Sequence, residues 1–150
     1  MKSLLVSLII VIPLLAFADL TTPEQLAKSY VAAIQSHDAE AVKKLVHPKF
    51  LASLKADGIS LLNWWIQHSI ADASKLNDPM WIRSKELSSD LLSSMNAEVT
   101  WNVRPEIQIE MQPYHDLGNG QKENTGFMSV QYAAKDNGNL YFVLQLPKKP

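Results

Sequence analysis

The stretch FMSVQYAAKDNGNLYFVLQL, residues 127–146, decides the fold of this chain. A turn-forming segment, KDNGN at 135–139, separates two apolar segments, and an Asn-Gly pair in this position is typical of a tight β-hairpin. Bulky side chains occur on both faces of the second apolar segment: Leu140, Phe142 and Leu144 on one, Tyr141 and Val143 on the other. The sequence therefore predicts a closing hairpin whose last strand lies inside a sheet.

The segments before this hairpin also alternate with a period of two, back to about Met80. Two apolar rows carry the pattern: Val99, Trp101 and Val103, then Ile107, Ile109 and Met111. The Arg104-Pro105 break between them predicts a bend or bulge, because proline cannot donate to a ladder of hydrogen bonds. We expect a polar loop over 116–125 (DLGNGQKENT). Within 84–96, a strand is expected to run through Leu87 and to be followed by an irregular connection.

The first half of the chain has helical spacing instead. Thr22-Pro23-Glu24-Gln25 is a start signal, because Thr22 can cap a helix and Gln25 can complete a capping box. Ser36-His37-Asp38 breaks this first helix, and Asp38 can cap a second, short one. Pro48 ends the second helix, which places His47 near its last carbonyl groups.

A third helix is predicted from about Ser60 to about Ser74, after a helical turn over 50–55 that Asp57-Gly58 closes. Its apolar face consists of Leu62, Ile66, Ile70 and Ala73. Trp64 projects to nearly the opposite side, which suggests a contact surface or a later segment folded over the helix. Helices followed by antiparallel strands indicate an α+β fold, with three N-terminal helices packed on one face of a curved antiparallel sheet.

Several of these segments resemble the nuclear transport factor 2-like superfamily, which includes the SnoaL-like domains. The resemblance rests on Ala27, Tyr30 and Ile34, on Asp38–Val42, on Leu45-Val46-His47-Pro48 and on Asp136–Val143. It covers about Thr22 to Leu146, although Leu140 stands where many members have tryptophan. It implies a cone-shaped, cystatin-like roll with a pocket at its wide end, and frequent dimers. It implies no single function.

Residues 1–18, MKSLLVSLIIVIPLLAFA, have the features of a secretory signal peptide: a basic start, a short apolar run and a small-residue end. The run is shorter than the roughly 20 residues that a membrane anchor needs. We therefore expect cleavage after Ala18 and a bacterial periplasmic or secreted protein with one domain, 19–150. The chain contains no cysteine, which excludes thiolate catalysis and a lipid-anchored form.

The charge of the chain is nearly balanced, with a net value of −1. No basic surface is implied, so we expect no nucleic-acid partner, and no membrane partner once the signal peptide is cleaved. The sequence contains no phosphate-binding glycine loop, no HExxH and no paired-carboxylate motif. We therefore predict no cofactor and no metal.

His68 and Asp72 are the candidate catalytic residues, because residues four apart share one flank of a helix. Beside a pocket, such a pair acts as an oriented general base. The alternative is a solvent-exposed helix pair of little energetic value. Glu110 falls on the polar face of its strand, so the sequence shows no carboxylate isolated among apolar side chains.

The candidate pocket residues are aromatic or soft apolar side chains near the expected junction of helices and sheet: Tyr30, Trp65, Trp81, Trp101, Met111 and Tyr114. The alternative is that they belong to the core. The preferred function is an exported binding or interaction domain for a small apolar ligand or a partner protein. The alternative is a small-molecule isomerase, dehydratase or cyclase that uses His68 and Asp72.

We also expect a homodimer through the outer face of the sheet. The helices can cover only one face, and an apolar row of Met128, Val130 and Tyr132 would join Tyr141 and Val143 on the other. A two-fold axis would bury this patch against its own copy.

Overall fold

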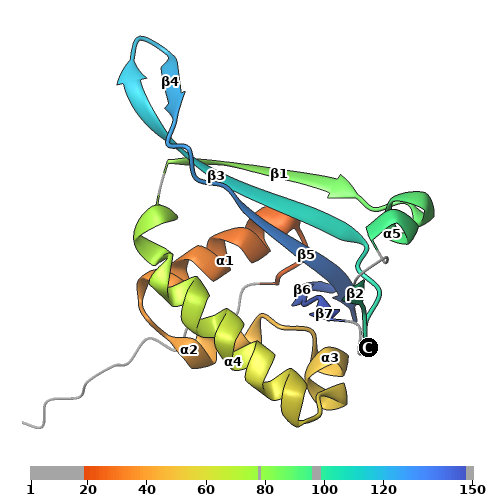
Figure 1. Cartoon of the computed structure of the whole chain (residues 1–150). Coiled ribbons are helices and arrows are strands. Elements are labelled where there is room, and N and C mark those ends of the chain that lie inside the picture. The colour runs from red at the N-terminus through yellow and green to blue at the C-terminus, as the bar shows by residue number, and fades with distance from the viewer. Residues whose placement is uncertain (1–18, 78, 96–98, 148–150) are drawn as a thin grey trace, which may run out of the picture.

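The computed structural model describes residues 19–77, 79–95 and 99–147 (Figure 1). The predicted signal peptide lies outside the described residues. Within them, no helix is both long enough and apolar enough to cross a membrane. The fold is α+β, with helices packed on an antiparallel sheet, as the sequence predicts.

The N-terminal half is helical. The helices are α1 (Pro23–Gln35), α2 (Ala39–Lys44), α3 (Pro48–Ser53), α4 (Ala56–Ala71) and the short 3-10 helix η1 (Ala73–Lys75). The predicted caps are confirmed: the Thr22 side chain accepts from the Gln25 N–H, and that of Asp38 accepts from the Ala41 N–H. Each cap satisfies a backbone donor that the first turn of the helix leaves unpaired.

Two helix boundaries differ from the prediction. The expected helical turn over 50–55 is instead the six-residue helix α3, so four α-helices, α1 to α4, precede the sheet instead of three. Asp57 and Gly58 do not close a turn, because they lie in the first turn of α4. The Gly58 backbone packs closely on the Leu54 side chain, and this approach lets α4 begin directly after α3.

The sheet is antiparallel, and its main path runs in the order β1-β3-β5-β6. The strands are β1 (Met80–Glu86), β3 (Ile107–Gly118), β4 (Gln121–Asn124), β5 (Ser129–Asp136) and β6 (Asn139–Val143). A separate two-stranded ladder joins β2 (Val99–Thr100) to β7 (Leu146–Pro147). The predicted hairpin turn at Asn137-Gly138 is confirmed, and both residues have positive φ.

The core lies between α1 and the inner face of the sheet. Helix α1 contacts β1, β3 and β6, and the Tyr30 ring packs edge-on against Phe142 with ring centroids 5.3 Å apart. Ile109 and Met111 of β3 are fully buried on this face. The apolar row predicted for β3 therefore faces the helices, and the polar row with Glu110 faces outward.

Strand β6 is the terminal strand of the main path, so it does not lie between two other strands as predicted. Its outer edge is nevertheless paired by backbone from the first half of the chain. Leu140 N–H donates to Leu20 C=O, Phe142 N–H donates to Leu45 C=O, and His47 N–H donates to Phe142 C=O. Both faces of β6 are also covered, because Phe142 packs against Tyr30 on one face and Tyr141 packs against the His47 ring on the other.

Three segments after Met80 differ from the prediction. Residues 116–124 are not a loop: β3 and β4 form a hairpin arm that projects beyond the body of the molecule (Figure 1). The connection after β1 contains the helix α5 (Ser89–Met95). The strand predicted over 99–103 is only the two residues of β2, and an irregular segment leads from it through Arg104-Pro105 to β3.

Candidate functional site

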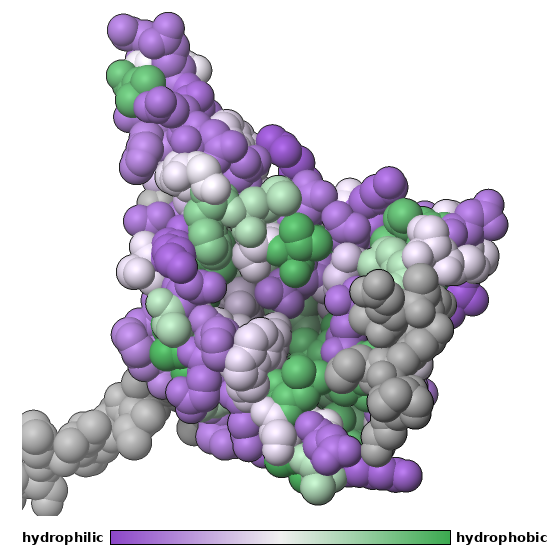
Figure 2. Space-filling view, in the orientation of Figure 1, coloured by the Kyte–Doolittle hydropathy of each residue, from purple (hydrophilic) through white to green (hydrophobic). Residues whose placement is uncertain are grey.

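An apolar groove separates α4 from β5 and the end of β6. We call it the α4–β5 groove; its volume is about 250 Å³. Its lining residues are Leu61, Trp64 and Trp65 from α4, Val130, Gln131 and Tyr132 from β5, and Val143, Leu144 and Gln145 at the end of β6. Figure 2 shows a hollow between these elements with hydrophobic surface at its floor.

Helix α4 presents two adjacent tryptophans to this groove. Trp65 is half-buried and stacks on Tyr30 with ring centroids 5.9 Å apart, so its position is fixed by the core. Trp64 is 55 % exposed and lies at the rim, where its ring contacts His68 at a centroid distance of 4.0 Å. The predicted outward direction of Trp64 is thus confirmed. Exposed tryptophan is costly in water, which makes this rim a candidate contact surface.

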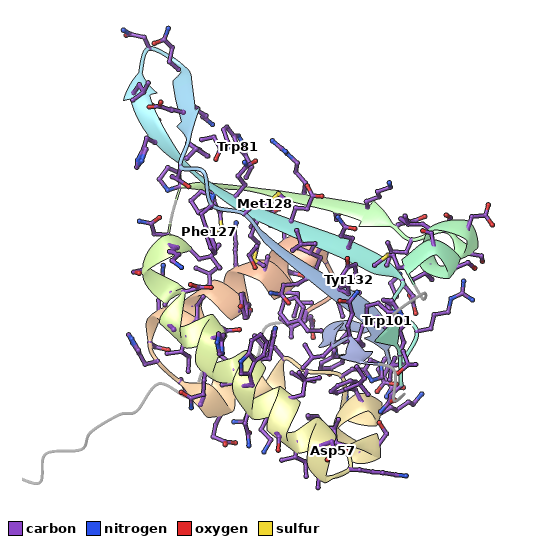
Figure 3. All side chains as sticks on the ribbon, in the orientation of Figure 1. Asp57, Trp81, Trp101, Phe127, Met128 and Tyr132 are labelled. Atoms are coloured by element: carbon purple, nitrogen blue, oxygen red, sulfur yellow. The ribbon has the colours of Figure 1, made fainter. Side chains whose placement is uncertain are left out.

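The sheet side of the groove carries a second aromatic pair. The Tyr132 and Trp101 rings meet edge-on at 5.2 Å, and Figure 3 shows them together toward the end of β5. Burial raises the pKa of the Tyr132 hydroxyl, which keeps the group neutral. The Trp101 Nε1–H is buried and has no hydrogen-bond partner among the described residues.

Two candidate pocket residues, Tyr30 and Met111, do not line the groove. Tyr30 is 2 % exposed and Met111 is fully buried, so both belong to the core. Burial raises the pKa of the Tyr30 hydroxyl, a hydrogen bond with Ser69 partly offsets that rise, and the nearby Asp72 charge adds to it. The core alternative therefore holds for these two residues.

Trp81 and Tyr114 form a separate cluster on the outer face of the sheet, near the base of the arm. Their rings are 4.5 Å apart, and Figure 3 shows Trp81 distant from Trp101. Lys122 lies 4.3 Å from the Tyr114 ring centroid, and Arg83 lies 5.6 Å from that of Trp81. Both are cation–aromatic contacts, and that of Lys122 joins β4 to β3 at the base of the arm.

The candidate catalytic pair is not assembled as a pair. His68 is exposed, and its Nδ1 lies 2.8 Å from the Trp64 carbonyl oxygen of its own helix. Asp72 forms an ion pair with Lys75 one turn further along the chain. No hydrogen bond or ion pair joins His68 to Asp72 in the described part of the chain, and neither lines the α4–β5 groove. The solvent-exposed alternative describes this geometry better than an oriented general base.

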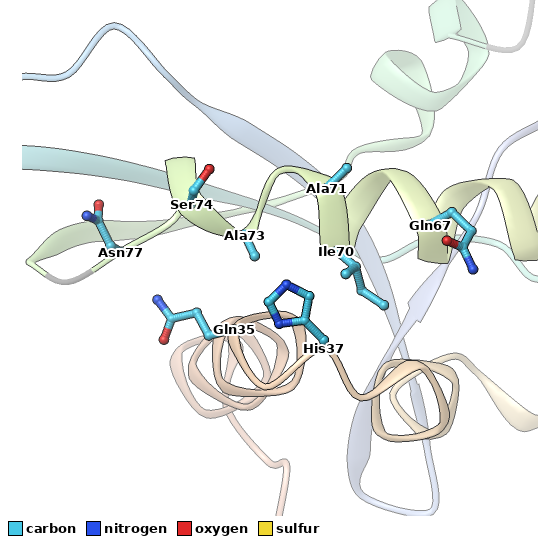
Figure 4. Close-up of a pocket in the computed structure, with 8 residues that line it drawn as sticks. All are labelled: Gln35, His37, Gln67, Ile70, Ala71, Ala73, Ser74 and Asn77. Carbon is cyan, nitrogen blue, oxygen red and sulfur yellow. The ribbon is translucent and has the colours of Figure 1, made fainter.

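A second cleft, of about 580 Å³, lies between the end of α1 and the end of α4 (Figure 4). Its lining consists of Gln35, His37, Gln67, Ile70, Ala71, Ala73, Ser74 and Asn77. Most of these side chains are exposed, and the Gln35 amide donates to the Leu76 carbonyl. This larger cleft is a weaker candidate, because its polar groups are exposed to water and no Trp, Tyr or Phe side chain lines it.

The outer face of the sheet is less apolar than the sequence suggests. Val143 is 2 % exposed, and Tyr132 and Tyr141 are half-buried against Trp101 and His47. Met128, just before β5, remains 49 % exposed. The predicted dimer patch is therefore confined to the Met128 end of the row.

Among the described residues, no group of three His, Asp or Glu side chains is arranged to hold a metal ion. Comparisons of the chain with protein-family models, curated proteins and solved structures find no match. Of the six candidate pocket residues, Trp65 is the one that lines this groove. The sequence placed Val130 in the predicted dimer patch instead, and it gave no reason to assign Leu61 or Gln145 to a pocket. Those three lie together only because β6 ends beside α4, and no local signal marks that meeting point.

Proposed function

We propose that this protein is an exported binding domain of the nuclear transport factor 2-like type, and that the α4–β5 groove receives an apolar group. The observation that carries the proposal is the exposed Trp64 at the rim of an aromatic, uncharged groove. Binding sites are commonly apolar and aromatic, with few polar groups. The proposal that the protein is exported rests only on the signal-peptide features of residues 1–18.

Contact between two of the segments that carry the resemblance supports the assignment of fold family. Val46 pairs in parallel with Phe142, which brings the Leu45–Pro48 segment beside the closing strand. Local sequence resemblance alone does not require such a contact. The proton-transfer alternative has no comparable support, because His68 faces solvent and Asp72 is paired with Lys75.

The proposal is tested with N-phenyl-1-naphthylamine, an uncharged fluorophore that brightens in apolar surroundings. We expect saturable binding to the mature chain and at least tenfold weaker binding to Trp64→Lys. Losing roughly 60 Å² of apolar contact accounts for about 1.5 kcal/mol, or about tenfold in affinity.

The matched control is Ile59→Lys. Ile59 lies on the same helix and is 49 % exposed, but it does not line the groove. We expect this variant to bind the fluorophore as the parent chain does. No saturable binding, or equal losses in both variants, would remove the groove as the site.

A further inference from the structure

Strand β5 has an edge that β6 leaves uncovered. The Asn137-Gly138 turn has φ of 49° and 85°, as in a type I′ hairpin, so its closing pair, Asp136 and Asn139, exchanges both main-chain hydrogen bonds. Bonded pairs recur at every second residue, and the ladder ends at Tyr132 and Val143. The next residue of β5 that faces this side is Val130.

The α4–β5 groove lies at this uncovered edge. Val130, Gln131 and Tyr132 line one wall, and Trp64 of α4 stands opposite. On its other side, β5 pairs with β3, where Glu110 lies across from Val130. The same alternation turns the Val130 N–H and C=O away from β3 and toward the groove.

The two outer edges of the main path of the sheet are protected. The outer edge of β6 is paired with backbone at Leu20, Leu45 and His47. Strand β1, at the opposite end, carries the exposed charged residues Arg83, Lys85 and Glu86, which oppose association of strands. The stretch 129–131 of β5 thus differs from both, because it is uncharged and next to aromatic side chains.

The lining of the groove matches an uncharged partner with main-chain hydrogen-bonding groups. None of its nine lining residues is acidic or basic, so a charged segment would lose hydration without gaining an ion pair. Its volume of about 250 Å³ is below the range of roughly 300–1,000 Å³ that is usual for enclosed small-molecule sites. A strand laid along an open groove needs less enclosure, because its hydrogen bonds come from the sheet edge.

We propose that the α4–β5 groove binds an extended, uncharged segment of a partner protein, which adds to β5 as a strand at Val130 and places alternate apolar side chains beside Trp64. This inference rests on the proposed function and names the class of partner. Main-chain hydrogen bonds at Val130 supply affinity, and the aromatic wall of α4 supplies the preference for apolar residues.

The test uses three soluble peptides in which threonine alternates with valine, leucine or phenylalanine between terminal lysines. Each is also made in two N-methylated versions, one methylated at every threonine and the other at every apolar residue. A strand on one edge uses the N–H groups of only one set. We therefore expect one version to lose about tenfold or more in affinity while the other binds nearly as the parent does.

The matched protein variants are Val130→Pro and Val130→Ala. Proline removes an N–H that faces the open edge, a position where sheets tolerate it, so the ladder with β3 is retained. We expect Val130→Pro to lose about tenfold in peptide affinity and Val130→Ala to lose less. The methylated peptides give the same information without changing the protein.

The outcomes separate this inference from the proposed function. Peptide binding that is sensitive to one methylation pattern and to Val130→Pro supports strand addition. Naphthylamine binding without peptide binding, or peptide binding that ignores methylation, overturns strand addition and leaves the groove as an apolar site. If neither probe binds, both proposals are wrong.

Discussion

Replacing His47 with alanine should cost a large part of the stability of this domain. His47 is 1 % exposed and joins three parts of the fold. Its Nδ1 accepts from the Lys49 N–H at 3.2 Å and so caps α3, while its Nε2 lies 3.5 Å from the Lys135 carbonyl oxygen. Its ring also packs edge-on against Tyr141, with centroids 5.9 Å apart.

The expected loss has two parts. Removing a side-chain cap costs about 1 kcal/mol. Emptying the space of a buried ring costs about 2–3 kcal/mol more, by analogy with large-to-small substitutions in cores. The sum, about 3–4 kcal/mol, is a substantial share of the roughly 5–15 kcal/mol that stabilises a typical domain. At a urea dependence of about 2 kcal/mol/M, the unfolding midpoint should fall by about 1.5–2 M.

The assay is urea unfolding of the mature chain, followed by tryptophan fluorescence. His47→Asn keeps a capping oxygen and should recover about 1 kcal/mol relative to His47→Ala. His115→Ala, at an exposed position on the arm, should stay within about 0.5 kcal/mol of the parent. If His47→Ala also stays within that margin, the inferred role of His47 is wrong.

Three further predictions concern other parts of the molecule. Burial raises the pKa of the Tyr30 hydroxyl, so above pH of about 10 this group ionises more readily in the unfolded chain than in the folded one. The stability of the fold should therefore fall as the pH rises beyond that value. Tyr30→Phe should reduce this fall in melting temperatures measured from pH 9 to 11. Sedimentation at micromolar concentration should show a homodimer that Met128→Lys weakens, whereas a parent chain that stays monomeric would contradict the predicted interface. Met128 is the position to change because it is exposed, whereas Val143, also predicted in this patch, is buried. Replacing residues 116–122 with Asn-Gly should change the free energy of unfolding by less than about 0.5 kcal/mol, because the arm is exposed, and a larger loss in urea unfolding would show that the arm contacts the body.

Local signals were sufficient where a few neighbouring residues determine the structure. The Thr22–Gln25 capping box, the Asp38 cap and the Asn137-Gly138 turn each act within four or five residues, and all three are present as predicted. The burial of Ile109 and Met111 also followed from alternation, because one face of β3 meets the helices.

The errors occurred where this link between pattern and burial is absent. In the arm, β4 is exposed throughout, so no alternation of apolar and polar residues marks it. In α5, Leu92 is the one buried residue that the helix shows, which leaves too little periodicity to detect. His47 was expected at the end of α2. Pro48 instead starts α3, and the His47 side chain caps the first turn of α3.

The α4–β5 groove could not be predicted for a different reason. Its walls come from α4 and from β5, and its floor depends on where β6 stops pairing. After that last pair the chain leaves β5, and the next strand, β7, pairs with β2 instead. Local patterns in a single sequence do not indicate which distant strand this part of the chain will pair with.

The backbone pairing on the outer edge of β6 also determines when the chain can fold. Leu20, just before α1, and Leu45, just after α2, take their backbone partners from Leu140 and Phe142, nearly the whole domain away in sequence. Until β6 has been synthesised, the carbonyl groups of Leu20 and Leu45 lack these hydrogen-bond donors. Contacts between such distant residues slow folding, because a long loop must close before they form.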